Sequence, residues 1–160
     1  MLFGAIGISW FFSAQFAVAK TPMFGAKLLL LYREEPLDGK TFALMDPMKS
    51  MQFQLVHLHA KYTGRSASND VVHGRLYFSE KMNSVMPRFW IPTESDDPHF
   101  ASAFSFTSQM HLGAGDAFNF EPAFYGGPLT NSTSAIKAKL KCYYGADAPA
   151  EASFAITKVQ

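Results

Sequence analysis

Several features that would point to a particular chemistry are scarce in this sequence, and each absence excludes a class of function. Cys142 is the only cysteine among the 160 residues, so the chain cannot form an internal disulfide or a thiolate metal site. Charged residues make up 17% of the chain, the net charge is +1, and Lys and Arg form no long run. Binding of nucleic acid normally needs a basic patch or stripe. We therefore expect no nucleic-acid partner.

Signatures of catalysis are also missing. No Gly-rich loop lies between a predicted strand and a helix, and no serine stands in a G-x-S-x-G sequence. These absences exclude a phosphate-binding loop and the nucleophile turn of many hydrolases. We expect a protein that is not an enzyme, with the one exception of a metal-dependent reaction considered below.

A long uncharged run opens the sequence. Residues 1–19 read MLFGAIGISWFFSAQFAVA, and two serines and one glutamine are the only polar residues. One interpretation is a secretory signal peptide, because Ala17-Val18-Ala19 fits the A-x-A cleavage pattern, although the usual basic start is lacking. A second is a membrane anchor, since 19 helical residues span about 28 Å of a core about 30 Å thick. The third is an arm buried against another subunit. We favour an anchor or a buried arm.

Short alternating runs bounded by turn residues follow this segment. The clearest is AIKAKLKCYY at residues 135–144, where lysines alternate with apolar side chains. We expect Lys137, Lys139 and Lys141 to form a solvated face, and ESDDPHF at residues 94–100 to be a solvated acidic turn. Nine strands are predicted in all: residues 27–33, 41–45, 51–62, 71–79, 88–91, 101–112, 117–124, 135–144 and 153–159.

Phenylalanine is the expected filler of the core. The 16 Phe residues suit the gap of about 10 Å between two packed sheets. The sequence therefore predicts an all-β fold, an antiparallel β-sandwich or jelly-roll-like domain, preceded by an apolar N-terminal segment. We assign residues 1–20 to that segment and residues 21–160 to a single domain, because no linker-like stretch divides the chain.

Three histidines give the most specific hypothesis of a site. If residues 51–62 and 71–79 form a hairpin with His59 opposite His73, facing side chains lie about 4.5–5.5 Å apart and His57 shares their face. Zinc or copper could then take three imidazole ligands and keep a fourth position for water. At these three positions alone, the pattern resembles the zinc ligands of α-type carbonic anhydrases.

Two observations favour a different interpretation of the histidines. Lys61 and Arg75 would lie beside them and repel a divalent cation, and neither strand has a carboxylate to orient an imidazole. We therefore prefer a solvated or interface face, with an anionic partner as one variant.

Two weaker candidates remain. Asn131-Ser132-Thr133 is an N-glycosylation sequence, so Asn131 would be modified if the chain enters a glycosylating pathway. Trp90, Tyr125 and the Gly126-Gly127 loop could form a stacking platform for a sugar or another ligand, or an aromatic plug in the core.

The expected function follows from the apolar start, the Phe-rich strands and the missing catalytic set. We expect a structural or interaction subunit of a larger assembly, such as a membrane complex, a surface fibre or a virion-type shell. Its partners would be other protein subunits, in a homo- or hetero-oligomer, and membrane lipid through residues 1–19. It would be membrane-associated or extracellular rather than a cytoplasmic monomer. The alternatives are a secreted or periplasmic metal-binding protein or zinc-dependent hydro-lyase using His57, His59 and His73, and a carbohydrate- or ligand-binding β-sandwich.

Overall fold

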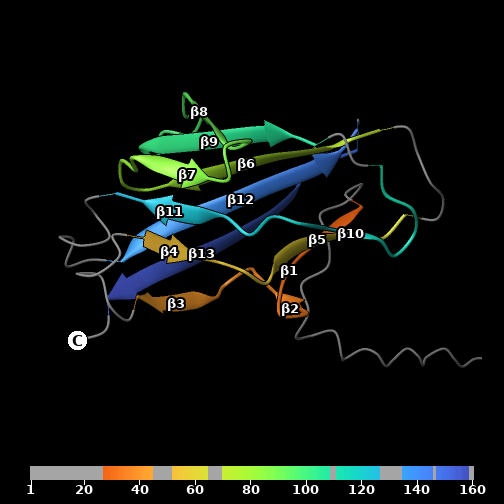
Figure 1. Ribbon diagram of the computed structural model, residues 1–160, viewed down its shortest axis with the longest axis horizontal. Helices are drawn as coiled ribbons and strands as arrows, with labels where there is room; N and C mark the ends of the chain where they lie inside the picture. The colour runs from red at the N-terminus through yellow and green to blue at the C-terminus, as the bar shows by residue number, and fades with distance from the viewer. Residues whose placement is uncertain are drawn as a thin grey trace, which may run out of the picture.

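The computed structural model describes residues 27–44, 52–64, 70–108, 111–126, 135–145 and 147–158. Every regular element in these ranges is a β-strand, and the strands form three mostly antiparallel sheets (Figure 1). The predicted all-β sandwich is confirmed. Within the described ranges, no helix has the length and apolarity needed to cross a membrane. The predictions for residues 1–19 and for Asn131 lie outside the described residues.

The largest sheet has six strands and forms one layer of the sandwich. Each neighbouring pair is antiparallel except β3 and β13, which run parallel. In spatial order its strands are β3 (Thr41–Leu44), β13 (Ala150–Lys158), β12 (Ile136–Tyr144), β6 (Val72–Phe78), β9 (Ser102–Thr107) and β8 (Ile91–Thr93).

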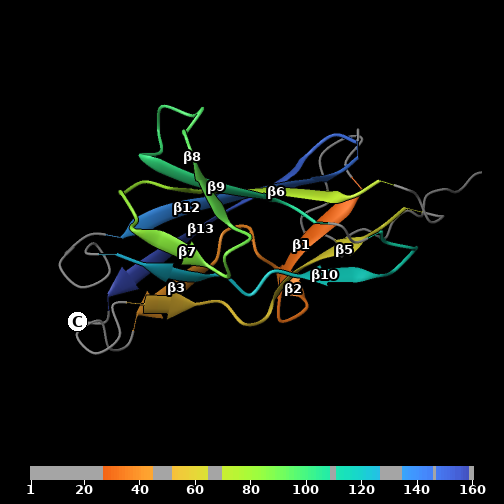
Figure 2. The same cartoon turned by 45° about the horizontal axis from the view of Figure 1, so that its top comes forward.

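Two smaller sheets lie along one face of the six-stranded sheet (Figures 1 and 2). The four-stranded sheet has the order β10 (Ala117–Asn119), β5 (Leu58–Tyr62), β1 (Leu28–Tyr32) and β2 (Glu35–Pro36). The three-stranded sheet has the order β4 (Gln52–Gln54), β11 (Ala123–Tyr125) and β7 (Ser84–Met86). Together they form the second layer.

The predictions of one strand at residues 51–62 and one at residues 117–124 are wrong in the same way. Each segment is broken, so that β4 and β5, and likewise β11 and β10, lie in different small sheets. Asn119 pairs with His59, and Ala123 pairs with Gln54. The chain therefore advances four residues from Asn119 to Ala123 but five residues from Gln54 to His59, so one residue is left without a partner in the ladder. Glu121 has a φ of 45° at the break, and Pro122 follows it without an N–H for a ladder. The misfit in register and the proline together explain why the ladder stops.

Aromatic rings connect the two layers. The rings of Tyr62 and Tyr144 lie 4.9 Å apart, and those of Phe78 and Phe124 lie 4.8 Å apart, each pair joining a small sheet to the large one. The alternation predicted for residues 135–144 is confirmed, because the even-numbered side chains from Ile136 to Tyr144 are buried. Cys142 is among them, free and buried, and burial raises the pKa of its thiol.

Candidate functional site

The hairpin predicted between residues 51–62 and 71–79 is wrong. In the four-stranded sheet, His59 on β5 pairs with Leu31 and Asn119. In the six-stranded sheet, His73 on β6 pairs with Tyr143 and Thr107. Period-two alternation predicts which side of a strand is buried, and two strands with matching patterns need not be neighbours.

The three histidines therefore do not converge. His57 lies in the turn before β5, and its neighbour Val56 is 44% exposed. Among the described residues, no three His, Cys, Asp or Glu side chains are placed to hold a metal ion. Metal binding by His57, His59 and His73 stays a prediction, without the shared face that motivated it.

Rows of side chains cross the outer face of the six-stranded sheet, the face turned away from the two small sheets. The pairing registers define three adjacent rows. The first holds Thr107, His73 and Tyr143; the second holds Ile91, Ser105, Arg75, Lys141 and Glu151; the third holds Thr93, Ala103, Tyr77, Lys139 and Ser153.

The acidic loop, residues 94–100, covers part of this outer face. The Asp96 carboxylate accepts a hydrogen bond of 2.7 Å from Arg75 Nη1 and one of 2.8 Å from the Tyr77 hydroxyl. Asp97 Oδ2 accepts a hydrogen bond of 2.9 Å from Lys139 Nζ. The loop is thus bonded to the sheet through Asp96 and Asp97, while Glu94, Asp96, Pro98 and His99 remain exposed, as expected for a solvated turn.

The loop also changes the surroundings of Lys139. Its side chain is only 16% exposed, and its ammonium group lies 4.5 Å from the centre of the Tyr77 ring. Lys139 is therefore an exception to the predicted solvated lysine face, because the loop that covers it is distant in sequence. Burial is the largest single influence on the pKa of Lys139 and lowers it, but the hydrogen bond to Asp97 and the charges of Asp97 and Glu151 together raise the pKa above its ordinary value.

Ionisation of the loop carboxylates is favoured by their donors. The hydrogen bond from Lys139, followed by the N–H of His99, holds the pKa of Asp97 well below its usual range. The hydrogen bond from Tyr77 and the charge of Arg75 lower the pKa of Asp96. Burial and the bond to Asp96 raise the pKa of Tyr77, so its hydroxyl remains a donor.

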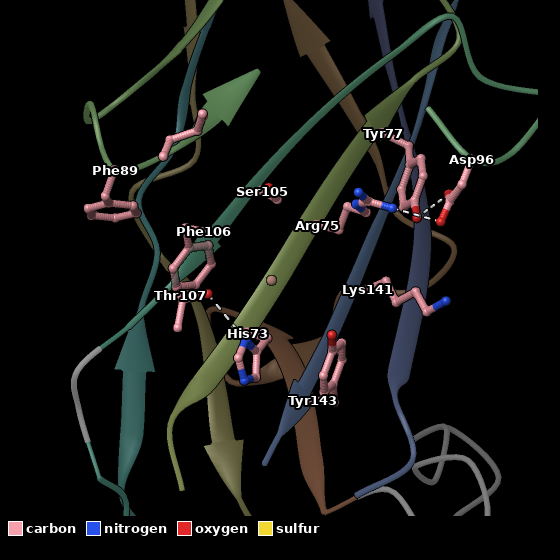
Figure 3. A pocket seen from close by; sticks show the side chains of 12 residues that line it. His73, Arg75, Tyr77, Phe89, Asp96, Ser105, Phe106, Thr107, Lys141 and Tyr143 are labelled. Atoms are coloured by element: carbon pink, nitrogen blue, oxygen red, sulfur yellow. Dashed lines mark hydrogen bonds and ion pairs between the residues drawn. The ribbon is translucent and has the colours of Figure 1, made fainter. Parts of the chain in front are cut away.

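A groove of about 620 Å³ lies next to the loop, over the first two rows (Figure 3). We call it the outer-face groove. Asp96 closes one end beside Arg75, and Phe89 and Phe106 lie on the side away from Lys141. The lining residues are His73, Gly74, Arg75, Tyr77, Phe89, Ile91, Asp96, Ser105, Phe106, Thr107, Lys141 and Tyr143.

The groove combines polar groups that are already bonded with polar groups that are not. His73 Nδ1 lies 3.2 Å from Thr107 Oγ1, and the His73 ring stacks on Tyr143 at 5.0 Å and 23°. By contrast, the Lys141 ammonium and the Tyr143 hydroxyl make no hydrogen bond or ion pair with any described residue. The Lys141 charge is nevertheless close enough to Asp96 to lower the pKa of that carboxyl.

Apolar side chains are exposed at the same groove. Phe89 is 41% exposed and Ile91 is 59% exposed, and with Val56 they are the large hydrophobic side chains that the described surface exposes most. The outer-face groove thus offers an apolar wall opposite a free cation and a free hydroxyl, on a sheet that holds them in fixed register. Such a surface has the groups needed to bind a ligand that is both apolar and polar.

A second hollow, of about 530 Å³, lies at the break in the small sheets and holds the other two predicted histidines. His59 Nε2 lies 3.1 Å from Glu34 Oε2, and His59 Nδ1 lies 3.3 Å from the His57 carbonyl oxygen. Both ring nitrogens therefore lie near oxygen acceptors. Arg33, Glu34 and Glu121 also line this hollow, and they are the non-glycine residues of the described chain with positive φ.

Of the two roles considered for Trp90, the structure agrees with an aromatic plug in the core and not with an exposed stacking platform. Trp90 is buried, with its ring 4.6 Å from that of Phe106, and its Nε1 has no hydrogen-bond partner among the described residues. Its neighbour Phe89 is the exposed ring, which the sequence interpretation missed. Tyr125 lies in β11, and Gly127 lies outside the described residues.

Comparison of the chain with protein-family models, with curated proteins and with solved structures finds no match.

Proposed function

We propose that this chain is a non-enzymatic interaction subunit of a larger assembly, and that the outer-face groove is its contact surface. The observation that carries the proposal is the exposure of Phe89 and Ile91 next to the unbonded side chains of Lys141 and Tyr143. Aromatic rings and tyrosine hydroxyls are enriched at protein interfaces, and a contiguous apolar patch is typical of a binding surface.

The polar groups of the groove support binding rather than catalysis. Thr107 and His73 form a hydroxyl–imidazole pair, the starting point of nucleophilic catalysis. A catalytic histidine is normally oriented by a third group through its other nitrogen. No described carboxylate bonds to His73 Nε2, and the ring is instead stacked on Tyr143.

The setting that we propose is a membrane-associated or extracellular assembly. It is supported by the uncharged sequence of residues 1–19, which suits contact with lipid or with a neighbouring subunit. A membrane complex, a surface fibre and a virion-type shell would each use both the apolar segment and a rigid sheet face.

The size of the native particle tests this function. The full-length protein, isolated from the cells that make it under conditions that preserve complexes, is expected to sediment well above the 17.7 kDa of one chain. Ile91→Lys should shift it towards smaller particles, because a charge in the apolar wall cannot be buried without a partner. Val56→Lys is the matched control, since Val56 is similarly exposed but lies in the other layer.

Two outcomes would contradict the proposal. One is a wild-type protein that sediments as a single chain. The other is an equal particle size for Ile91→Lys and wild type, which would place the contact surface elsewhere.

A further inference from the structure

We propose that the outer-face groove binds an acidic peptide segment of a partner protein, seated as the acidic loop is seated on the adjoining part of the same sheet face. The inference rests on the proposed function, because it names the chemistry of the partner that the contact surface would receive.

The acidic loop shows how this sheet face holds a peptide. Two successive carboxylates, of Asp96 and Asp97, bond to Arg75 and Tyr77 and to Lys139. Phe100 then places its ring 5.5 Å from that of Tyr77. The pattern is two carboxylates followed by an aromatic side chain. The carboxylates take charged and hydroxyl donors, and the ring covers the apolar part of the face.

The same kinds of donor recur in the groove without a carboxylate. Lys141 lies two residues beyond Lys139 on β12, so both lysines project from the same side of the sheet. Tyr143, two residues further along β12, adds a hydroxyl to the groove, as Tyr77 provides a hydroxyl to the loop site. Neither Lys141 Nζ nor the Tyr143 hydroxyl bonds to a described residue. The groove therefore repeats the cation and hydroxyl pair of the loop site, and no described carboxylate is bonded to it.

The charges around Lys141 do not neutralise it by direct contact. Glu151 is its cross-strand neighbour on β13 but does not line the groove and makes no ion pair with it in the described structure. Asp96, which closes the groove, is already bonded to Arg75 and Tyr77. Lys141 is thus the free cation for an incoming carboxylate.

The apolar wall favours a peptide over an anionic glycan or a nucleic acid. Phe89 and Ile91 suit an apolar side chain next to the acidic residues, as Phe100 follows Asp96 and Asp97 in the loop. A sulfated glycan or a nucleic acid would draw on several free cations. Within the described lining, Lys141 is the one lysine or arginine without an ion pair.

The loop sequence itself supplies the probe for a test. Fluorescein-labelled ESDDPHF and its amide counterpart ESNNPHF would be titrated into the full-length protein and followed by fluorescence anisotropy. We expect saturable binding of the acidic peptide, weakened by raising salt from about 0.05 to about 0.5 M. The affinity of the amide peptide should be lower by about tenfold or more, as expected when a charged hydrogen bond is lost.

Protein variants then locate the bound peptide. Lys141→Glu should weaken binding of the acidic peptide about tenfold or more, because it replaces attraction by repulsion. Lys61→Glu is the matched control, an exposed lysine on β5 in the opposite layer, and it should bind as wild type does. Equal affinity of Lys141→Glu and wild type would overturn the inference, as would equal affinity of the two peptides or the absence of peptide binding.

The two proposals can fail separately. If Ile91→Lys reduces the native particle but no acidic peptide binds, the contact surface stands and the acidic partner is wrong. If acidic peptide binding depends on Lys141 while Ile91→Lys leaves the particle unchanged, the groove binds peptides but does not hold the assembly. Tight binding of heparin in place of the acidic peptide, lost with Lys141→Glu, would assign the groove to anionic glycans and overturn the inference.

Discussion

At the scale of single residues, the ion pair of Asp97 and Lys139 fastens the acidic loop to the sheet. Their side chains are 23% and 16% exposed, and Asp97 also accepts hydrogen bonds from the backbone N–H and, at 3.1 Å, the ring Nδ1 of His99. These donors favour the charged carboxylate and lower the pKa of Asp97 in the folded protein. In the unfolded chain the pKa of an aspartate is about 3.9.

This difference in pKa predicts loss of stability in acid. A carboxyl with a lowered folded pKa stabilises the fold above its unfolded pKa, and that contribution disappears as the pH falls below about 4. The free energy of unfolding should therefore decrease from about pH 5 towards pH 2, and Asp97→Asn should make this decrease smaller. Urea unfolding at a series of pH values measures both slopes.

Glu94→Gln is the control for this prediction. Glu94 is an exposed carboxylate of the same loop that makes no ion pair with a described residue. Its variant should keep the wild-type dependence on pH. An Asp97→Asn protein with the wild-type slope would show that the Asp97 carboxylate does not fasten the loop.

At the scale of secondary-structure elements, the turn between β1 and β2 has an unusual sequence for its conformation. Tyr32 pairs with Glu35, so the loop has two residues, and its φ angles are 51° at Arg33 and 64° at Glu34. Two positive φ angles define a type I′ turn, for which Asn-Gly is the preferred sequence. Arg-Glu in this position is strained, and strained backbone is often found near functional sites.

Relief of this strain should stabilise the fold. Arg33→Asn keeps Glu34 and its contact with His59 while replacing one unfavourable residue, and it should raise the free energy of unfolding by about 0.5–1 kcal/mol. The cation–π contact of Arg33 with Tyr32, at 5.6 Å, is lost in the variant and limits the gain. Chemical unfolding at neutral pH measures the change.

A control variant separates backbone strain from the loss of side-chain contacts. Arg33→Ala also removes the contact with Tyr32 but does not favour a positive φ, so it should not be stabilising. If Arg33→Asn were no more stable than Arg33→Ala, the strain assigned to this turn would be absent.

At the scale of the whole molecule, the two layers separate residues that their local pattern places together. His59 belongs to the four-stranded sheet, whereas His73 belongs to the outer face of the six-stranded sheet. The hydrophobic core lies between the two layers. A single zinc ion bound by His57, His59 and His73 would require a rearrangement of the sheets.

The separation of the histidines predicts the outcome of a metal-binding experiment. Full-length wild type and the variant with His57, His59 and His73 all changed to alanine should retain the same amount of zinc or copper after equilibration and gel filtration. His99→Ala is the control, since His99 lies in the acidic loop. Loss of one equivalent of metal in the triple variant, but not in His99→Ala, would establish the metal-binding alternative. Metal content by mass spectrometry measures the result.

The sequence by itself determined the class of the fold and the inward-facing side chains of the clearest strands. Alternation with period two is a local property, so Ile136, Leu140 and Cys142 could be assigned to the core before any pairing was known. The same reasoning explains the burial of Leu58, Ala60, Leu76 and Phe78, although it assigned their strands to the wrong partners.

The tertiary structure alone decided which strands are neighbours and what covers their outer faces. Pairing depends on contacts between distant parts of the chain, and strands with similar alternation are interchangeable in a local pattern. The acidic loop docks on Lys139 across 42 residues, and Phe89 is exposed while Trp90 is buried, because the space left by other strands determines each position. The acidic loop covers one part of the outer face, and the outer-face groove lies beside it. The candidate site therefore depends on packing between distant segments of the chain, and local periodicity does not predict such packing.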